Sequence, residues 1–357
     1  MAKVLMKGNE AIALAAIKGG MDAFFGYPIT PQNEIPEYLS REMPARGKVF
    51  VQAESEVSAI NMVYGAAGAG ARVMTSSSSP GIALKQEGIT YLVGANLPAV
   101  IVNVMRGGPG LGGIQPSQAD YNQMTRGGGN GDYNCIVMAP EDVQESVDLM
   151  KESFDLADYY RNPVMLVADG LIGQMMAPVD FDHPTPDYVL EPKDWATTGT
   201  KGRTNGQRNI INSLSLVAET LEQMNHHLQT KFDHMKENHQ RYEMINMENA
   251  EIAIVAYGTS SRICRSAIQE LKAEGINVGI IRPIFIWPFP DKAFKELPES
   301  VKGLLVVEMS MGQMIDDVKI ANEGRLPIGF YGRVGGVIPE PNEIVKAVKD
   351  FMGGLNG

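Results

Sequence analysis

The sequence predicts an α/β protein built on a parallel β-sheet with helices covering both faces. Residues 98–105 are apolar at almost every position, which is typical of a strand buried on both faces. Other short apolar runs alternate with helix-length segments whose apolar residues recur every three or four positions. At about 100–200 residues per domain, the chain of 357 residues predicts two such units or three.

Residues 1 to about 170 supply the first unit. Helices are predicted, in chain order, over residues 8–18, 55–70, 82–94 and 140–156. Strands are predicted over residues 22–27, 49–52, 71–75, 98–105, 135–138 and 164–168. The last helix is expected to begin at Pro140, with Glu141 and Asp142 in its positively polarised first turn.

A change of composition follows this unit. Residues 180–201 contain three prolines and little periodicity, which indicates a linker. Residues 221–242 carry apolar side chains at mixed spacings of three and four, which predicts an amphipathic helix. His227 and His234 lie a heptad apart on it, so a metal site is one alternative. A solvated helix face is the simpler interpretation, because no carboxylates accompany them in a ligand pattern.

A second α/β unit begins at Glu251. Its strands are predicted over residues 252–257, 278–282, 303–308 and 328–331, and its helices over residues 262–274, 312–322 and 341–351. The chain is therefore predicted to divide into residues 1–190, 191–250 and 251–357.

The composition excludes several classes of protein. With 31 Lys and Arg against 42 Asp and Glu, the formal net charge is −11, which argues against nucleic-acid or polybasic membrane binding. Neither a secretory signal nor an apolar run of about 18 residues is visible, so a cytoplasmic protein is expected. Two cysteines, Cys135 and Cys264, are too few for an iron–sulfur cluster. No histidine precedes His183, so the first unit cannot hold a Ser-His-Asp triad.

A glycine-rich loop follows the strand over residues 98–105. Gly108, Gly110 and Gly113 match G-x-G-x-x-G, and a dinucleotide-dependent dehydrogenase is one alternative. That function needs a helix opening at the loop, whereas Pro109 lies inside it and no helical pattern begins. An active-site loop that lets a ligand approach the backbone is the favoured interpretation.

Candidate site residues cluster at predicted strand ends and helix starts. Two prolines, Pro28 and Pro31, fix the backbone around Thr30 and hold its hydroxyl outward. Glu54 and Glu56 stand at the start of the helix predicted over residues 55–70, where acids can also simply complement the helix dipole.

The remaining candidates follow the next two strands. The run Thr75–Gly81 can present hydroxyls and amides to an anion, or can cap a helix. Arg106 can bind a carboxylate bidentately, or can form a structural ion pair. Because ligands of α/β sheets bind at the carboxyl ends of strands, we expect Thr30, Glu56 and Arg106 on one side of the sheet.

Five motifs together resemble the alpha-type subunit of 2-oxoacid:ferredoxin oxidoreductases, over nearly the whole chain. They are Tyr27-Pro-Ile-Thr-Pro31, Gln52-Ala-Glu-Ser-Glu56, Thr75-Ser-Ser-Ser-Ser-Pro-Gly81, Met105-Arg-Gly-Gly-Pro-Gly110 and Trp287-Pro-Phe-Pro290. Residues 6–10 and 31–37 are most similar to the 2-ketoisovalerate (3-methyl-2-oxobutanoate) branch, and the 2-oxoglutarate branch is the alternative. The resemblance implies a thiamine-diphosphate Pyr-type domain followed by a transketolase C-terminal-like domain.

The resemblance also implies a reaction and partners. The family oxidatively decarboxylates 2-oxo acids to acyl-CoA and CO₂ and passes the electrons to ferredoxin. Its thiamine diphosphate lies between a Pyr-type and a PP-type domain, and Asp169-Gly170 here lacks the rest of the PP motif. We therefore expect a hetero-oligomer, in which a PP-type subunit with Mg²⁺, an iron–sulfur subunit and a gamma-type subunit complete the enzyme. No metal is expected on this chain. A non-catalytic assembly subunit is the competing hypothesis.

Residue roles are carried over by matching motifs. Glu56 matches the glutamate that hydrogen-bonds N1′ of the aminopyrimidine, and its spacing to Gly65 favours it over Glu54. The cofactor-binding residues implied by the resemblance are Tyr27, Pro28, Ile29 and Glu56. Thr30 and Arg106 match positions that hold the substrate carboxylate.

Overall fold

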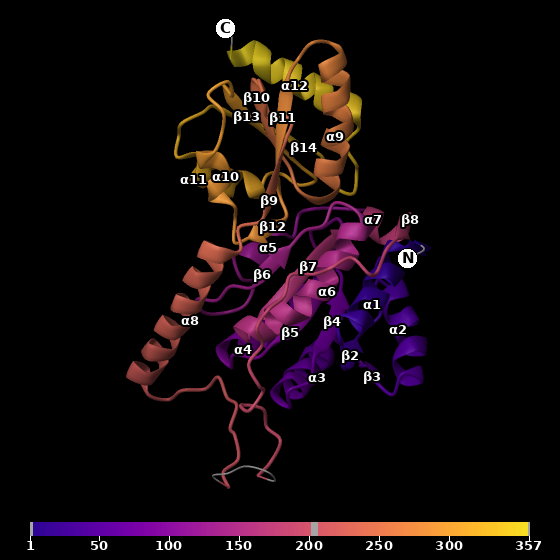
Figure 1. The fold of residues 1–357 in the computed structure, drawn as a ribbon, viewed down its shortest axis with the longest axis vertical. Helices are drawn as coiled ribbons and strands as arrows, with labels where there is room; N and C mark the ends of the chain where they lie inside the picture. The colour runs from indigo at the N-terminus through magenta and orange to yellow at the C-terminus, as the bar shows by residue number, and fades with distance from the viewer. Residues whose placement is uncertain (1–2, 201–205, 356–357) are drawn as a thin grey trace.

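The computed structural model describes residues 3–200 and 206–355, arranged as two α/β units stacked along the long axis of the molecule (Figure 1). The described residues form a seven-stranded, a five-stranded and a two-stranded sheet. The predicted fold class, an α/β protein with parallel sheets covered by helices, is confirmed.

The larger sheet lies in the first unit and has the order β12-β6-β7-β5-β4-β2-β3. All neighbours are parallel except β12 and β6. The strands in chain order are β2 (Ala23–Gly26), β3 (Val49–Gln52), β4 (Val73–Ser77), β5 (Ala99–Met105), β6 (Ile136–Met138), β7 (Pro163–Asp169) and β12 (Phe285–Trp287). Every residue of the central strands β4, β5 and β7 is buried, as expected for a sheet covered on both faces.

Seven helices belong to this unit. They are α1 (Gly8–Lys18), α2 (Glu34–Ala45), α3 (Glu56–Gly68), α4 (Ser79–Gly94), α5 (Tyr121–Thr125), α6 (Val143–Tyr160) and α7 (Gly170–Gln174). The prediction that α6 begins at Pro140 is wrong. Asp142 caps this helix instead, because its carboxylate accepts a hydrogen bond of 2.8 Å from the amide of Glu145.

The smaller sheet lies in the second unit and has the order β14-β13-β10-β11-β9. Its strands are β9 (Tyr242–Ile245), β10 (Ile252–Val255), β11 (Val278–Pro283), β13 (Gly303–Glu308) and β14 (Ile328–Gly332), and β9 alone is antiparallel to its neighbour. The helices are α9 (Gly258–Ala273), α10 (Asp291–Lys295), α11 (Met314–Asn322) and α12 (Pro341–Leu355).

Two strands lie across the predicted division of the chain. Strand β9 precedes residue 251 but pairs with β11, and β12 follows residue 251 but extends the sheet of the first unit. Both are three or four residues long, too short for a periodic signal. The division into residues 1–190, 191–250 and 251–357 stays a proposal.

Long-range contacts hold the two units together. Arg282 of β11, 2% exposed, donates hydrogen bonds of 2.7 and 2.8 Å to the carboxylate of Glu145 on α6. Gln118 of the first unit donates to the carbonyl of Tyr257 at 2.8 Å and accepts from the amide of Met309 at 3.0 Å. Because Arg282 and Gln118 are buried, their polar groups are costly to leave unpaired, and these contacts help to fix the docking of the second unit.

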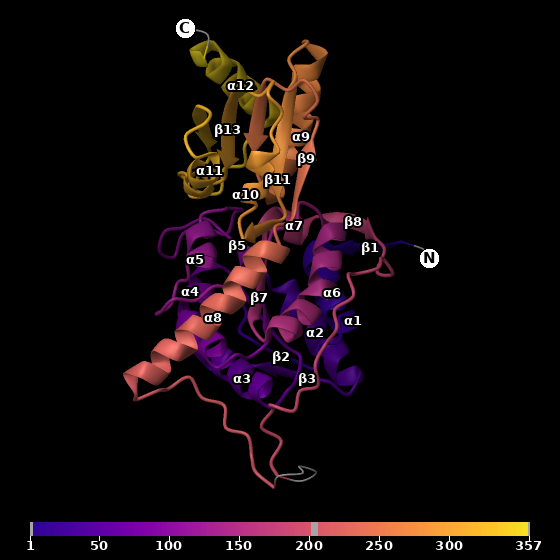
Figure 2. The same ribbon diagram turned by 60° about the vertical axis from the view of Figure 1, so that its left-hand side comes forward.

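Of the connection between the units, residues 187–200 and 206–217 lie at the end of the first unit that is remote from the second unit (Figure 1). The connection leads to α8 (Ala218–Asn238), which crosses the outside of the first unit (Figure 2). His234 on this helix pairs with the hydroxyl of Tyr160 at 3.0 Å. Within the described ranges, no group of three His, Cys, Asp or Glu side chains is placed so that it could hold a metal ion.

A short ribbon completes the structure. Strand β1 (Val4–Lys7) pairs antiparallel with β8 (Met176–Val179) beside α1.

Residues 3–200 and 206–355 contain no helix long and apolar enough to cross a membrane.

Candidate functional site

The candidate site lies at the carboxyl ends of the strands of the larger sheet. Thr30 follows β2, Glu56 is the first residue of the helix after β3, and Arg106 directly follows β5. These strands are parallel, with β2 beside β3 and β4 between β2 and β5, so their carboxyl ends lie at one edge of the sheet.

Arg106 connects two loops at this edge. Its Nη1 donates to the carbonyl of Thr30 at 2.9 Å, and its Nη2 donates to the carbonyl of Leu111 at 3.1 Å. Arg106 as a whole is 8% exposed, and its buried Nε has no hydrogen-bond partner. The structure thus brings Arg106 and Thr30 together and leaves one buried donor of Arg106 available.

Hydrogen bonds between its own residues hold the turn around Thr30. The Thr30–Pro31 peptide bond is cis. The side-chain amide of Asn33 donates to the Thr30 hydroxyl at 3.3 Å, and the side-chain amide of Gln32 donates to the carbonyl of Tyr27 at 3.3 Å. Tyr27 is 36% exposed, although its backbone is fixed in this way.

Glu56 is buried, whereas Glu54 is exposed. Ser55 caps α3 by accepting a hydrogen bond of 3.1 Å from the amide of Ser58, so Glu56 occupies the first turn. A Cβ atom on Gly81 would lie 2.7 Å from Oε1 of Glu56, which shows that the carboxylate lies against the start of α4. Glu54 instead receives a hydrogen bond from the Ser58 hydroxyl at the surface.

A buried lysine beside Glu56 was not predicted. The side chain of Lys85 on α4 is fully buried, and its Nζ donates to the Thr75 hydroxyl at 2.8 Å and to the Ser76 carbonyl at 2.9 Å. Burial lowers the pKa of Lys85 to about 7, although the charge of Glu56 partly opposes this shift. Gly81, Lys85 and Gly88 share one helix face, but the sequence does not show which helix packs against that face.

Asp120 was also missed. Its carboxylate accepts hydrogen bonds of 2.6 Å from Ser79 and 2.9 Å from Asn103 of β5. Burial raises the pKa of Asp120, and these hydrogen bonds oppose the shift. Asn103 was the available signal, since it is the polar residue inside an otherwise apolar strand.

The hydroxyls of Ser77 and Ser78 are among the further buried polar atoms of the described residues that have no hydrogen-bond partner. Buried polar groups are normally paired, so the unpaired hydroxyls and Arg106 Nε together indicate where polar atoms of a ligand can bind.

The glycine-rich loop does not open a helix. The Gly107 amide donates to the Gln115 carbonyl at 3.0 Å, so the loop closes on itself. Gly112 has a positive φ of 58°, and a Cβ there would lie 1.9 Å from the Gly107 carbonyl oxygen. The next helix begins only at Tyr121. The dinucleotide-binding alternative is therefore wrong, because that site needs a helix N-terminus at this loop.

The second unit reaches the same loop. A Cβ on Gly336, which has a positive φ of 92°, would lie 2.3 Å from the Cβ of Gln115. Close packing of the two loops thus requires glycine at position 336, and it places the second unit next to the candidate site.

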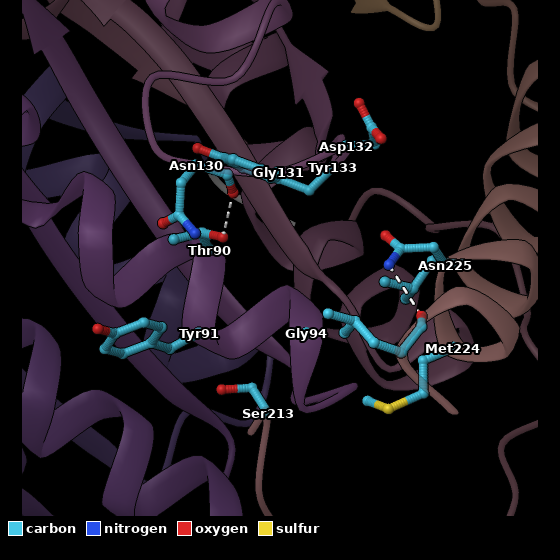
Figure 3. A pocket seen from close by; sticks show the side chains of 12 residues that line it. Thr90, Tyr91, Gly94, Asn130, Gly131, Asp132, Tyr133, Ser213, Met224 and Asn225 are labelled. Atoms are coloured by element: carbon cyan, nitrogen blue, oxygen red, sulfur yellow. Dashed lines mark hydrogen bonds between the residues drawn. The ribbon is translucent and has the colours of Figure 1, made fainter. Parts of the chain in front are cut away.

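The pocket shown in Figure 3 lies elsewhere. It has a volume of about 230 Å³ and lies between α4, the loop at Asn130–Tyr133 and α8. Thr90 donates to the Asn130 carbonyl at 2.7 Å on its wall. Neither Glu56 nor Arg106 lines this pocket.

Solved structures define the class of protein. The fold matches a 2-oxoglutarate:ferredoxin oxidoreductase from Magnetococcus marinus with a TM-score of 0.86 and 28% identity, over 98% of this chain and 65% of that chain. It also matches a split-gene transketolase with a TM-score of 0.61 and 15% identity, over 97% of both chains, which shows a shared fold. The class is therefore that of 2-oxoacid oxidoreductase and transketolase-like folds.

Sequence comparisons give the family. The profile "Pyruvate flavodoxin/ferredoxin oxidoreductase, thiamine diP-bdg" matches residues 14–252, and "Pyruvate:ferredoxin oxidoreductase core domain II" matches residues 250–344. The ketoisovalerate oxidoreductase subunit VorB of Methanothermobacter marburgensis is 48% identical over all of both chains. The 2-oxoglutarate synthase subunit KorA of Methanocaldococcus jannaschii is 33% identical, over 96% of this chain and 98% of that one.

The chain belongs to the 2-oxoacid:ferredoxin oxidoreductase family, as one of its oxidoreductase subunits, and contains the family's thiamine-diphosphate-binding domain. The predicted resemblance to the alpha-type subunits, including the ketoisovalerate branch, is confirmed.

Proposed function

We propose that this chain is the subunit that binds the aminopyrimidine ring of thiamine diphosphate in a CoA-dependent, ferredoxin-reducing oxidoreductase for branched-chain 2-oxo acids. The observation that carries the proposal is the placement of Glu56, Thr30 and Arg106 at one edge of the sheet. The full-length likeness to VorB supports the choice of a branched substrate.

The residues present fit the aminopyrimidine part of the cofactor. Glu56 is a buried carboxylate that can share a proton with the ring atom N1′. Tyr27, Pro28 and Ile29 follow β2 at the same edge of the sheet and are exposed or partly exposed, so they can offer a surface for the ring. When bound, thiamine diphosphate supplies a nucleophilic carbon and an electron sink for decarboxylation.

Arg106 and Thr30 are proposed to hold the carboxylate of the 2-oxo acid. Arg106 Nε is buried and unpaired, so it can donate a charge-assisted hydrogen bond without breaking an existing one. The Thr30 hydroxyl already accepts from Asn33 and can donate its own proton to the same carboxylate. The two groups together orient the 2-oxo carbon.

Other parts of the enzyme are proposed to lie on partner subunits. Both cysteines are buried, and burial raises the pKa of Cys135 to about 12 and that of Cys264 further. Such thiols are poor cluster ligands, because ligation requires the thiolate. We therefore assign the iron–sulfur clusters to an iron–sulfur partner subunit. We assign Mg²⁺ and the diphosphate to a PP-type partner, and propose that a gamma-type subunit completes the complex. The complex is proposed to act in the cytoplasm.

The proposed division of the cofactor site gives a prediction for the isolated chain. Purified alone, it should bind thiamine diphosphate weakly, because the diphosphate and Mg²⁺ carry much of the binding energy and lie on the partner. Isothermal titration calorimetry with Mg²⁺ present checks this, with the assembled complex as the control. Tight, stoichiometric binding by the chain alone would show that the site is not divided.

Substrate choice has a second candidate, 2-oxoglutarate, favoured by the 33% identity to KorA. The test is anaerobic, CoA-dependent reduction of viologen by the native complex, given 2-oxoisovalerate, pyruvate or 2-oxoglutarate. We expect the branched acid to be preferred. Preference for 2-oxoglutarate would keep the chemistry and change the branch. An intact, cofactor-loaded complex that is inactive with all three would favour an assembly role.

A further inference from the structure

Arg106 is held at the carboxyl end of β5 by its main chain as well as by its guanidinium. Its amide donates a hydrogen bond of 3.0 Å to the hydroxyl oxygen of Ser79, the first residue of α4. The same hydroxyl lies 3.2 Å from the carbonyl oxygen of Arg106. Because β4 and β5 are neighbouring parallel strands, Ser79 ties the start of α4 to the residue that follows the next strand of the sheet.

Asp120 completes this link. Its Oδ2 accepts a hydrogen bond of 2.6 Å from the Ser79 hydroxyl and one of 2.9 Å from the side-chain amide of Asn103. A hydroxyl has one proton to donate, and the contact of Ser79 with Asp120 is shorter than its contact with the Arg106 carbonyl. The proton of Ser79 therefore points to Asp120, which leaves the lone pairs of its oxygen for the Arg106 amide.

The side chain of Asp120 does not cap the helix that it precedes. Asp120 stands at the N-cap position of α5, yet its carboxylate makes no capping hydrogen bond. The main chain around it is fixed by Gln313 of the second unit, whose Nε2 donates to the carbonyl of Ala119 at 2.6 Å and whose Oε1 accepts from the amide of Asn122 at 2.8 Å. Asp120 is thus a fixed acceptor directed at the link between Ser79 and Arg106.

We propose that Asp120 is a positioning residue for Arg106: through the Ser79 hydroxyl it fixes the main chain from which the Arg106 guanidinium reaches the substrate carboxylate. This inference rests on the proposed function of Arg106. A shift of about 1 Å in a group that orients the substrate can cost about 10²-fold in rate. Gly107 and Gly108 follow Arg106, so the loop itself offers little resistance to such a shift.

The experiment uses the assembled complex and steady-state kinetics with 2-oxoisovalerate. Asp120→Ala should lower kcat/KM by about 10-fold, because the Ser79 hydroxyl loses the acceptor that directs its proton. Asp120→Asn should restore most of this loss, because its amide oxygen can accept the same hydrogen bonds. The dissociation constant of thiamine diphosphate, measured by calorimetry, should keep its wild-type value in both variants.

A double variant separates positioning from general damage. If Asp120 acts through Arg106, Asp120→Ala should lower kcat/KM by no more than about 2-fold when Arg106 is already replaced by alanine, because substitutions within one hydrogen-bond network are not additive. Damage that is independent of Arg106 would instead multiply the two single losses, and this result would overturn the proposal.

Asp158 provides the matched control. Its side chain is 6% exposed, and its carboxylate pairs with Arg72 at 2.8 Å and with Lys193 at 2.6 Å. Arg72 directly precedes β4, so this cluster lies at the opposite edge of the sheet from Arg106. Asp158→Ala should lower the thermal midpoint of the complex and leave kcat/KM unchanged.

Wild-type kcat/KM in an assembled Asp120→Ala complex would also overturn the proposal, and so would an Asp120→Asn variant as impaired as Asp120→Ala. If Asp120→Ala does not assemble, Ser79→Ala breaks the same link from its other end and should give the same loss of kcat/KM. Failure of the proposed function is distinguishable from these results, because Arg106→Ala itself would then retain the wild-type kcat/KM.

Discussion

Replacing Glu56 by alanine is expected to abolish turnover of the assembled complex and leave its assembly intact. Loss of a positioned acid–base group typically costs about 10²–10⁴-fold in rate. The carboxylate of Glu56 is buried against Gly81 at the start of α4, so we expect no other side chain to replace it. Anaerobic viologen reduction measures the activity, and size-exclusion chromatography measures assembly.

Glu54→Ala is the matched control. Glu54 lies two residues earlier and is exposed, and its carboxylate accepts a hydrogen bond from the Ser58 hydroxyl. Its removal should leave turnover near the wild-type level. Glu56→Gln adds a second test, because the amide keeps the volume of the side chain but not its proton affinity. Substantial activity in Glu56→Ala, with a loss in Glu54→Ala, would transfer the role to Glu54.

Local patterns predicted most of the elements that place the site. Strands β3 and β13 have the predicted bounds, because short apolar runs between turn residues depend little on the rest of the chain. The carboxyl-edge rule then sufficed to bring Thr30 and Arg106 together, which the 2.9 Å hydrogen bond confirms. The roles of these residues and of Glu56 stay predictions.

Features that depend on distant packing could not be predicted. Strand β12 forms because Phe285 and Trp287 meet the edge of β6, about 150 residues earlier in the chain, and nothing in its own three residues indicates this. The burial of Lys85 depends likewise on the close approach of α3, which Gly81 and Gly88 permit. A lysine in a helix is usually exposed, so composition alone indicated a surface residue.

Replacing Arg106 by alanine is expected to weaken the use of 2-oxo acids far more than the binding of thiamine diphosphate. A hydrogen bond to a charged group contributes about 1.5–3 kcal/mol, so kcat/KM should fall by about 10- to 10²-fold. Arg106 also ties Leu111 and Thr30 together, so its loss frees the glycine-rich loop. Arg106→Lys keeps the charge but not the fork that joins the two carbonyls, and should recover only part of the activity.

The role of Arg106 is decided by comparing the effect of its removal on kcat/KM with the effect on the binding of thiamine diphosphate. Steady-state kinetics with 2-oxoisovalerate gives kcat/KM, and calorimetry on the same complex gives the dissociation constant of thiamine diphosphate. Arg126→Ala is the control, because Arg126 is partly exposed and pairs with Asp317 at 2.9 Å beyond α5. It removes one positive charge from the same unit, and should change neither quantity appreciably. Equal losses of both in Arg106→Ala would mean that Arg106 shapes the whole site through Thr30 and Leu111 and does not bind the substrate carboxylate.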